Sequence, residues 1–333
     1  MNSYYLGADI GATKTHVLIV DQDGQVAGFG KGGPGNHETV GYEGLRLALS
    51  DATEQALAAA NIDREMINGA GFGVAGYDWP SEKRETDLAI QSIGLKSAVK
   101  IVNDTILGLV AGTPQGWGVT VVSGTGCNCR GWDQSHSREG RVAGGSSRAG
   151  EGAGGTELME KVGQAIAHEW TQRGPHTELT SAIIKSTGAR SLEDLLEGFC
   201  MGYYDLNASM APLVFQVAAD GDPVAKDIIE WAGNELGELA KAVIRQLEFE
   251  NLEFDVVLVG SMFNGGSLLI EPMRQSIQTL APGACLLRLT TPPVVGAALL
   301  GMEAAGYKPS GAILNGLGMI RPESLHERAR LWS

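Results

Sequence analysis

The sequence lacks the features that mark membrane proteins, secreted proteins and nucleic-acid-binding proteins. No apolar run reaches the ~18 residues that a membrane helix requires, and Asp9 comes too early in the chain for a signal peptide. The 25 Lys and Arg residues are outnumbered by 39 Asp and Glu residues, and the net charge of −14 disfavours binding to nucleic acid or to anionic membranes. We therefore expect a cytoplasmic protein that binds neither.

Cysteine is scarce, whereas glycine is abundant. Four Cys residues in 333 do not suggest a disulfide framework, and the pair Cys127 and Cys129 lacks the second pair that a zinc site needs. We expect all four to be reduced thiols. The 47 glycines are about twice the average usage and follow no repeat, which indicates tight turns and close backbone approach to ligands.

The length and the pattern of apolar residues predict two globular α/β domains. Hydrophobic residues make up 43% and charged residues 19%, the balance of an ordinary globular protein. A break at 112–116, rich in turn-forming residues, predicts a boundary between domain 1–113 and domain 114–333. In the first domain we expect strands at 4–10, 15–20, 25–30, 68–75 and 98–102, and helices at 41–60, 81–93 and 105–111.

The opening pattern of strand, glycine turn and strand returns after the break. The rest of the second domain is rich in helix patterns, and Asp222 and Pro223 form the cap and first residue of a long helix that ends near 247. Here we expect strands at 118–123, 255–260 and 284–289, helices at 267–279 and 293–305, and a surface-bound tail at 307–333.

The turn between the first two strands is a candidate phosphate site. Gly11 lets the backbone approach a phosphate, and Thr13 and Lys14 can donate hydrogen bonds to its oxygens. Asp9 is placed to bind Mg²⁺, directly or through water. The turn joins two strands and lacks a Gly-Lys-Ser/Thr ending, so it is not a P-loop. A polar β-turn without a ligand is the alternative.

Two further glycine segments lie in the second domain. Ser-Gly-Thr-Gly at 123–126 forms the equivalent turn, and a matched pair of such turns favours two walls of a phosphate-binding cleft. Gly260 and Ser261 follow a buried strand and precede a helix, which is where ligands bind in open α/β sheets. A nucleotide site is our favoured interpretation, and a structural turn is the alternative.

Asn103 and Asp104 end an apolar strand and begin a helix. One interpretation is a helix N-cap, a position that Asp fills well. The other is a general base, which removes the proton from a sugar hydroxyl as that hydroxyl attacks the γ-phosphate of a nucleotide. The spacing alone is compatible with both.

Together these segments resemble one family. Their order is that of the sugar kinase, actin and heat-shock ATPase superfamily. Within it the chain is similar to the N-acetylglucosamine kinases, which are grouped with activator ATPases in the BadF/BadG/BcrA/BcrD ATPase family. The resemblance covers about residues 5–305, and its most specific piece is Ser-Gly-Thr-Gly-Cys-Asn-Cys-Arg. The segments that carry it are 7–15, 102–105, 123–130 and 259–261.

The resemblance implies a fold, a reaction and a set of site residues. It implies two ribonuclease-H-like domains with a nucleotide and substrate cleft between them, a homodimer, and transfer of phosphate from ATP with Mg²⁺ to an amino sugar, above all N-acetylglucosamine to give its 6-phosphate. Asp104 would be the catalytic base and Asp9 the metal ligand. The ATP-binding residues would be Gly11, Thr13, Lys14, Gly124, Thr125, Gly260 and Ser261. The sugar-binding residues would be Asn36, Gly76, Asp104, Thr125, Gly126, Asn128 and Glu151.

One loop departs from the family pattern. Where the family has a Trp-Gly run that leads to Gly-Asp-Glu-Gly-Ser, this chain has Gly144 for the Trp and Gly150 for the acid before Glu151. The identity of the sugar is therefore open, with glucosamine and N-acetylmuramic acid as alternatives. Arg148 beside this loop either pairs with the carboxylate of N-acetylmuramic acid or is a solvated surface residue.

Two other kinds of protein share the resemblance. An ATP-hydrolysing activator holds an iron–sulfur cluster by Cys thiolates across a dimer interface. Cys127 and Cys129 lie inside the phosphate hairpin, which is a poor place for such a cluster. A nucleotide-gated regulator of the actin or chaperone type would carry a DNA-binding or peptide-binding extension, and we expect none here.

Overall fold

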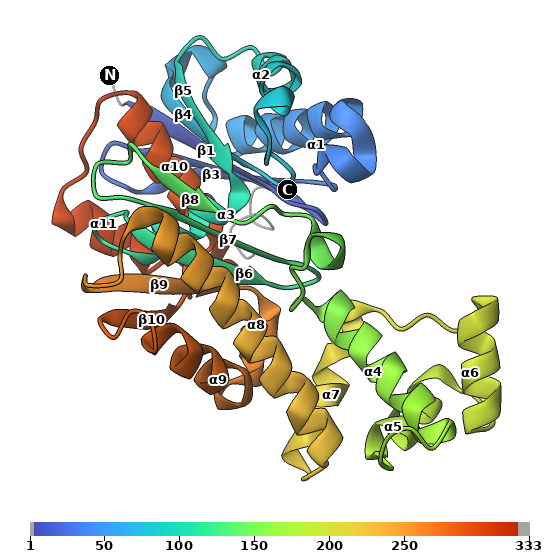
Figure 1. The fold of residues 1–333 in the computed structure, drawn as a ribbon. Helices are drawn as coiled ribbons and strands as arrows, with labels where there is room; N and C mark the ends of the chain where they lie inside the picture. Colours follow the sequence, from blue (N-terminus) through green and yellow to red (C-terminus); the bar gives the residue numbers. More distant parts are fainter. Residues whose placement is uncertain (1–2, 326–333) are drawn as a thin grey trace. The chain divides into compact units, whose positions relative to one another are not determined.

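The computed structural model describes residues 3–325, which fall into two compact units (Figure 1). The first unit comprises the residues up to 120, 131–139 and those from 287 onward, and the second comprises 121–130 and 140–286. The predicted division at 113/114 differs from these units, chiefly because the chain after Leu286 returns to the first unit. Within residues 3–325, each helix is too short or too polar to span a bilayer.

A five-stranded mixed sheet forms the centre of the first unit, in the order β3-β2-β1-β4-β5. The first three strands are antiparallel, and β4 and β5 run parallel to β1. All five lie within a few residues of the predicted strands: β1 (Tyr4–Ile10), β2 (Thr15–Asp21), β3 (Val26–Gly32), β4 (Ile67–Val74) and β5 (Ala98–Asn103).

Helices cover both faces of this sheet, as the alternation of buried side chains requires. Leu6 and Ile10 of β1 pack with Leu45 on one face, whereas Tyr5 packs with Ala298 on the other. The first helix begins four residues earlier than predicted and is kinked at Gly41, where φ is 68°. The helices of this unit are α1 (His37–Ala60), α2 (Lys83–Gln91), α3 (Asp104–Gly112), α10 (Pro293–Ala304) and α11 (Gly311–Gly318).

Many glycines allow helices to approach this sheet closely. Glycines at every second position of β3 face alanines at every fourth position of α1, and an added Cβ would overlap with the helix backbone. The pairs are Gly28 with Ala56, Gly30 with Ala52, and Gly32 with Ala48. Gly7 and Gly71 meet α10 in the same way. The sequence predicts glycines in turns and near ligands; the structure also uses glycines for close packing of helices on the sheet.

The predicted surface tail is only partly at the surface. Leu317 and Leu325 are buried in the same cluster as Phe29, on the face of the sheet that α10 also covers. The Tyr307 hydroxyl donates a hydrogen bond to the carbonyl of Gln22 at 2.8 Å. These apolar side chains therefore contribute to the core of the first unit; residues 326–333 of the predicted tail lie outside the described part of the chain.

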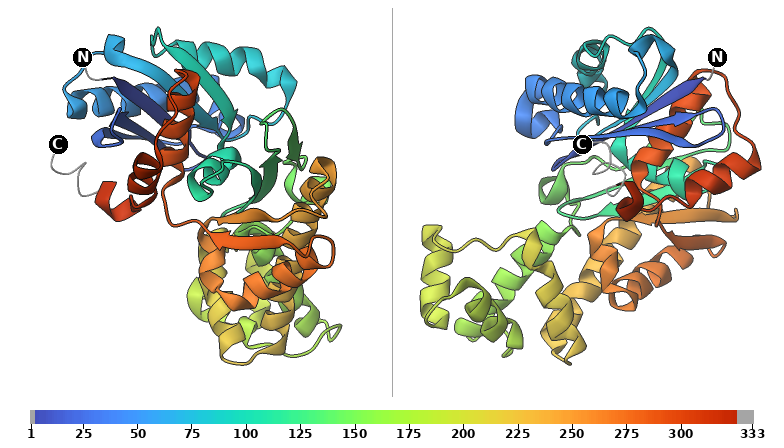
Figure 2. Two further views of the ribbon diagram at one scale, coloured as in Figure 1. Left: turned by 90° about the vertical axis from the view of Figure 1, so that its left-hand side faces the viewer. Right: turned by 180° about the vertical axis from the view of Figure 1, so that it is seen from behind.

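The second unit contains most of a five-stranded sheet in the order β10-β9-β6-β7-β8, together with several helices. Figures 1 and 2 show α4 to α7, drawn in green and yellow, grouped together. Its strands are β6 (Gly118–Ser123), β7 (Cys127–Trp132), β8 (Glu139–Arg141), β9 (Phe254–Val259) and β10 (Ala284–Arg288). Its helices are α4 (Gly155–Trp170), α5 (Glu178–Thr187), α6 (Leu192–Met201), α7 (Ala211–Ala219), α8 (Pro223–Leu247) and α9 (Ser267–Gln278).

The long helix α8 begins where the sequence predicts. The Asp222 carboxylate accepts a hydrogen bond from the N–H of Ala225 at 2.8 Å, and Pro223 occupies the first turn. Helix α4 buries Leu158 and Ile166, whereas Trp170 at its end is 53% exposed. The sequence patterns did not give bounds for the four helices α4 to α7.

Candidate active site

Three parallel strands of the first unit end at one edge of the sheet. In the register of β1, β4 and β5, Ile10 lies opposite Val74, and Val74 lies opposite Asn103. Neighbouring strands are about 4.8 Å apart, so Asp9 and Asp104 lie on the order of 10 Å from one another at this edge. The carboxyl ends of parallel strands are the usual place for ligands in such sheets.

The β1–β2 turn forms one side of this edge. Its backbone is closed by a hydrogen bond from the N–H of Gly11 to the carbonyl of Lys14 at 3.0 Å, and the N–H of Gly35 donates to the carbonyl of Gly11 at 3.0 Å. Thr13 and Lys14 are exposed at the tip. The backbone of the turn is therefore held by two hydrogen bonds, and the turn offers a hydroxyl and an ammonium group to solvent, as a phosphate site requires.

Asp9 has an unusual carboxyl group. Burial raises its pKa to about 6, and nearby Lys14 opposes that shift. No group of three His, Cys, Asp or Glu that could enclose a metal ion occurs within residues 3–325. Mg²⁺ does not need one, because it is commonly held by one or two carboxylates, water and substrate phosphates. The donor set at Asp9 therefore fits Mg²⁺ bound to a nucleotide.

Asn36 and Gly76 lie in contact at the same edge. The Asn36 side chain caps α1 by accepting a hydrogen bond from the N–H of Glu38 at 2.9 Å. Gly76 has φ +78°, and a Cβ there would run into the Asn36 amide. Only glycine fits this position without strain. The two predicted sugar-binding residues are thus brought together.

The helix cap beside Asp104 is supplied by its neighbour. The Asn103 side chain accepts a hydrogen bond from the N–H of Thr105 at 3.0 Å, which makes Asn103 the N-cap of α3. Asp104 is the first residue of the helix and is partly exposed, whereas Asn103 is buried. The capping interpretation therefore applies to Asn103.

The glycine turn of the second unit is attached to a helix. The N–H groups of Gly155 and Thr156, at the start of α4, donate to the carbonyls of Gly124 and Thr125 at 2.8 and 2.9 Å. Gly126 packs so closely on Gly154 that an added Cβ on Gly154 would overlap with it. The carbonyls of this turn are thus held by α4, while Thr125 stays exposed.

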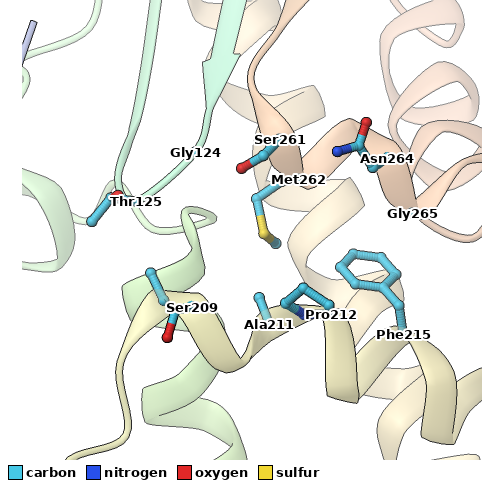
Figure 3. Close-up of a pocket in the computed structure, with 11 residues that line it drawn as sticks. Gly124, Thr125, Ser209, Ala211, Pro212, Phe215, Ser261, Met262, Asn264 and Gly265 are labelled. Carbon is cyan, nitrogen blue, oxygen red and sulfur yellow. The ribbon is translucent and has the colours of Figure 1, made fainter. Parts of the chain in front are cut away.

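A cavity of about 460 Å³ adjoins this turn (Figure 3). Ser261 and Asn264, from the short 3-10 helix η5 (Ser261–Gly265), lie across it from Pro212 and Phe215 of α7, and Thr125 lies at one end. No charged side chain is found among the described residues that line it: Gly124, Thr125, Ala208, Ser209, Ala211, Pro212, Phe215, Ser261, Met262, Asn264 and Gly265.

Gly260, the residue before η5, allows this short helix to lie close to the glycine turn at 123–126. Gly260 has φ +114°, and a Cβ there would overlap with the carbonyl of Ser123. The structure thus joins Gly124, Thr125, Gly260 and Ser261, which were predicted from separate segments. Sequence reasoning missed Phe215, because nothing in the apolar pattern of α7 distinguishes a cavity wall from a core position.

Asn128 and Glu151 both have local partners in the second unit. The Asn128 side chain accepts a hydrogen bond from the N–H of Cys129 at 2.8 Å. The buried Glu151 carboxylate accepts from the N–H groups of Ala143 and Gly145. Through these two hydrogen bonds, Glu151 holds the backbone of the loop that departs from the family pattern.

All four cysteines are free, as predicted. Burial raises the pKa of the Cys127 thiol to about 11, and burial also raises the pKa of Cys129. Cys129 is fully buried, so the pair does not lie at a surface where a cluster could be held across a dimer interface. This placement gives no support to an iron–sulfur cluster in the phosphate hairpin.

Two α/β units with glycine turns at the heads of their sheets define the class of ribonuclease-H-like, actin-like ATPases. Residues 6–301 match the model of the BadF/BadG/BcrA/BcrD ATPase family, and the chain belongs to that family. The predicted family and fold class are thus confirmed.

Curated relatives in this family are similar to the chain over nearly its whole length. An N-acetylmuramic acid/N-acetylglucosamine kinase from Clostridium acetobutylicum is 26% identical, over 89% of this chain and 97% of its own length. An N-acetyl-D-glucosamine kinase from Dictyostelium discoideum is 27% identical, over 90% of this chain and 98% of its own length.

Solved structures share the fold. A candidate N-acetylglucosamine kinase from Chromobacterium violaceum superposes with a TM-score of 0.69 at 24% identity, covering 90% of this chain and 98% of that one. A ROK family glucokinase from Streptomyces griseus, in complex with glucose and AMPPNP, superposes with a TM-score of 0.56 at 21% identity, covering 90% of this chain and all of that one.

Proposed function

We propose that this protein transfers the γ-phosphoryl group of ATP to a hydroxyl of an amino sugar, converting N-acetylglucosamine to N-acetylglucosamine 6-phosphate. The observation that carries the proposal is the partly exposed carboxylate of Asp104, whose neighbour Asn103 supplies the helix cap. The names of the two curated relatives support an amino sugar as the acceptor.

In this mechanism Asp104 takes the proton of the sugar 6-hydroxyl as that oxygen attacks the γ-phosphorus. A bond forms between the sugar oxygen and phosphorus, the bond from phosphorus to the β–γ bridging oxygen breaks, and ADP leaves with that electron pair. Thr13, Lys14 and Thr125 donate hydrogen bonds to the phosphates. Asp9 would hold Mg²⁺, which would supply positive charge to offset the negative charge of the nucleotide phosphates.

The nucleotide and the sugar use different surfaces. The cavity beside Gly124, Thr125 and Ser261 has the size and the apolar wall that suit a nucleoside. Gly260, next to Ser261, lies so close to the Ser123 carbonyl that a Cβ would overlap with it. Asn36 and Gly76 form the sugar-binding surface of the first unit. In the second unit, the remaining proposed sugar contacts are Gly126, Asn128 and the loop that Glu151 holds.

A second acceptor is supported by one specific feature. Arg148, in the loop that departs from the family pattern, is exposed and carries a positive charge. N-Acetylmuramic acid bears a carboxylate, and the relative from Clostridium acetobutylicum is named for this sugar as well. We also propose a homodimer, which is the arrangement that the family resemblance implies, and a cytoplasmic location.

A coupled assay of ADP release tests the function. The purified chain with Mg-ATP is offered N-acetylglucosamine, glucosamine, N-acetylmuramic acid, N-acetylmannosamine and glucose in turn. We expect release with N-acetylglucosamine and little without a sugar. Release that is independent of every sugar, from an iron-containing coloured protein, would favour the activator class; silence over the whole panel from a folded protein would reject the kinase.

A further inference from the structure

A second carboxylate lies close to Asp104 in the first unit and takes no part in the reaction described above. Asp78 follows Gly76 by two residues and is only 8% exposed. A buried carboxylate is costly unless hydrogen bonds compensate for its lost water, so its partners indicate why it is there. One of these partners, Asn103, is the N-cap of α3.

The side-chain amide of Asn103 links Asp78 to that helix. Its nitrogen donates to the Asp78 carboxylate at 3.2 Å and, at 3.4 Å, to the carbonyl of Tyr77. Its oxygen accepts from the N–H of Thr105 at 3.0 Å. Asn103 and Thr105 are each 2% exposed, so both residues that flank Asp104 are held in a buried network.

The loop that carries Asp78 is itself held in place. The Glu82 carboxylate accepts hydrogen bonds from the N–H of Asp78 at 2.7 Å and from the N–H of Trp79 at 2.8 Å. The same loop begins at Gly76, which lies against Asn36. A movement of this loop would therefore change the orientation of the Asn103 amide as well.

We propose that Asp78 is a positioning residue for Asp104. By accepting from the Asn103 amide, it fixes which end of that amide caps α3, and so fixes the backbone from which the Asp104 carboxylate projects. It also couples the Gly76 loop, which borders the proposed sugar site, to the position of the base. The proposal rests on the proposed function in one respect, namely that Asp104 is the base.

Kinetics of two variants separate this role from a general structural one. The variant Asp78→Asn keeps an oxygen that can accept from the Asn103 amide, whereas Asp78→Ala does not. We expect Asp78→Ala to lose about 10- to 100-fold in kcat, with KM for ATP within about twofold, because small displacements of a reacting group have effects of this size. Asp78→Asn should keep kcat within about threefold. Equal loss in both variants would overturn the proposal.

A double-mutant cycle tests whether the effect passes through Asn103. If it does, the double variant Asp78→Ala with Asn103→Ala should be no slower than Asn103→Ala alone. Additive losses would contradict the proposal. The control is Asp87→Ala on α2, which removes the ion pair with Lys83 and should leave kcat unchanged.

Amide hydrogen exchange gives a readout that does not depend on the reaction. In the full chain without ligands, Asp78→Ala should speed exchange at least fivefold in a peptide covering residues 103–107, and Asp78→Asn should not. Unchanged exchange in Asp78→Ala would overturn the proposal. If the protein released no ADP with any sugar, the proposed function would fail, yet this measurement would still decide whether Asp78 orders the start of α3.

Discussion

The edge of the first sheet and the cavity of the second unit differ most in charge. The edge combines Asp9, Lys14 and Asp104 within one small region, whereas the cavity has no charged side chain among the described residues that line it. Charged groups in fixed positions act on developing charge in a transition state, whereas an apolar wall contributes to binding alone. The difference suggests that the first unit governs kcat and the second governs KM for ATP.

The largest expected effect on kcat comes from a change to Asp104, the proposed base. Asp104→Asn should lower kcat by about 10²- to 10⁴-fold, the range over which a general base contributes, and should leave KM for ATP within a few-fold. Steady-state kinetics with N-acetylglucosamine measure both values. Asp51→Asn, an exposed carboxylate on α1, is the matched control and should behave as the unaltered protein. A rise in KM for ATP with normal kcat would assign Asp104 to binding.

Substitution of a side chain in the cavity wall should change KM for ATP and leave kcat nearly unchanged. Phe215→Ala should raise KM for ATP by about 10-fold, because stacking of a base on an aromatic ring contributes about 1–3 kcal/mol, and kcat should change little. Gln216→Ala, on the next and exposed position of α7, is the control. If Phe215→Ala lowered kcat with KM unchanged, the division between the two regions would be wrong.

The pH dependence tests the contribution of Asp9. Its pKa is raised to about 6, so the carboxylate is ionised above that pH and gains a proton below it. Because a metal ligand must be ionised, kcat/KM should fall about tenfold per pH unit below pH 6. A profile at several Mg²⁺ concentrations checks this, and excess Mg²⁺ should move the fall to lower pH. A flat profile down to pH 5 would contradict the role of Asp9.

The smallest expected effect concerns Arg148. Arg148→Ala should lower kcat/KM for N-acetylmuramic acid by about threefold relative to N-acetylglucosamine, since an exposed charge pair contributes at most about 1 kcal/mol. Both sugars are compared in one coupled assay. An unchanged ratio would make Arg148 a solvated surface residue.

Local signals sufficed for the elements whose chemistry is encoded in short segments. The strand pattern of β1, β2 and β4, the cap at Asp222 and the glycine turns were predicted, because alternation, capping and turn residues act over a few positions. The class of the fold followed from their order. The boundary after 286 was missed, because the return of the chain to the first unit is a long-range contact.

The candidate site could be predicted only in part, for the same physical reason. Sequence spacing left a helix cap and a general base as alternative roles for Asp104, and the 3.0 Å contact with Thr105 assigns the cap to Asn103. Phe215 gave no signal, because its role depends on facing η5 across a cavity. Glu151 was expected near the sugar, and the structure shows that its oxygens accept from backbone N–H groups.

The central claim is transfer of phosphate from ATP to an amino sugar, and the reaction product tests it most directly. Phosphorus NMR of the protein with Mg-ATP and N-acetylglucosamine should show ADP and a sugar monophosphate ester growing in equal amounts, with no product from Asp104→Asn on the same timescale. ADP accompanied by inorganic phosphate in place of the ester would contradict the claim.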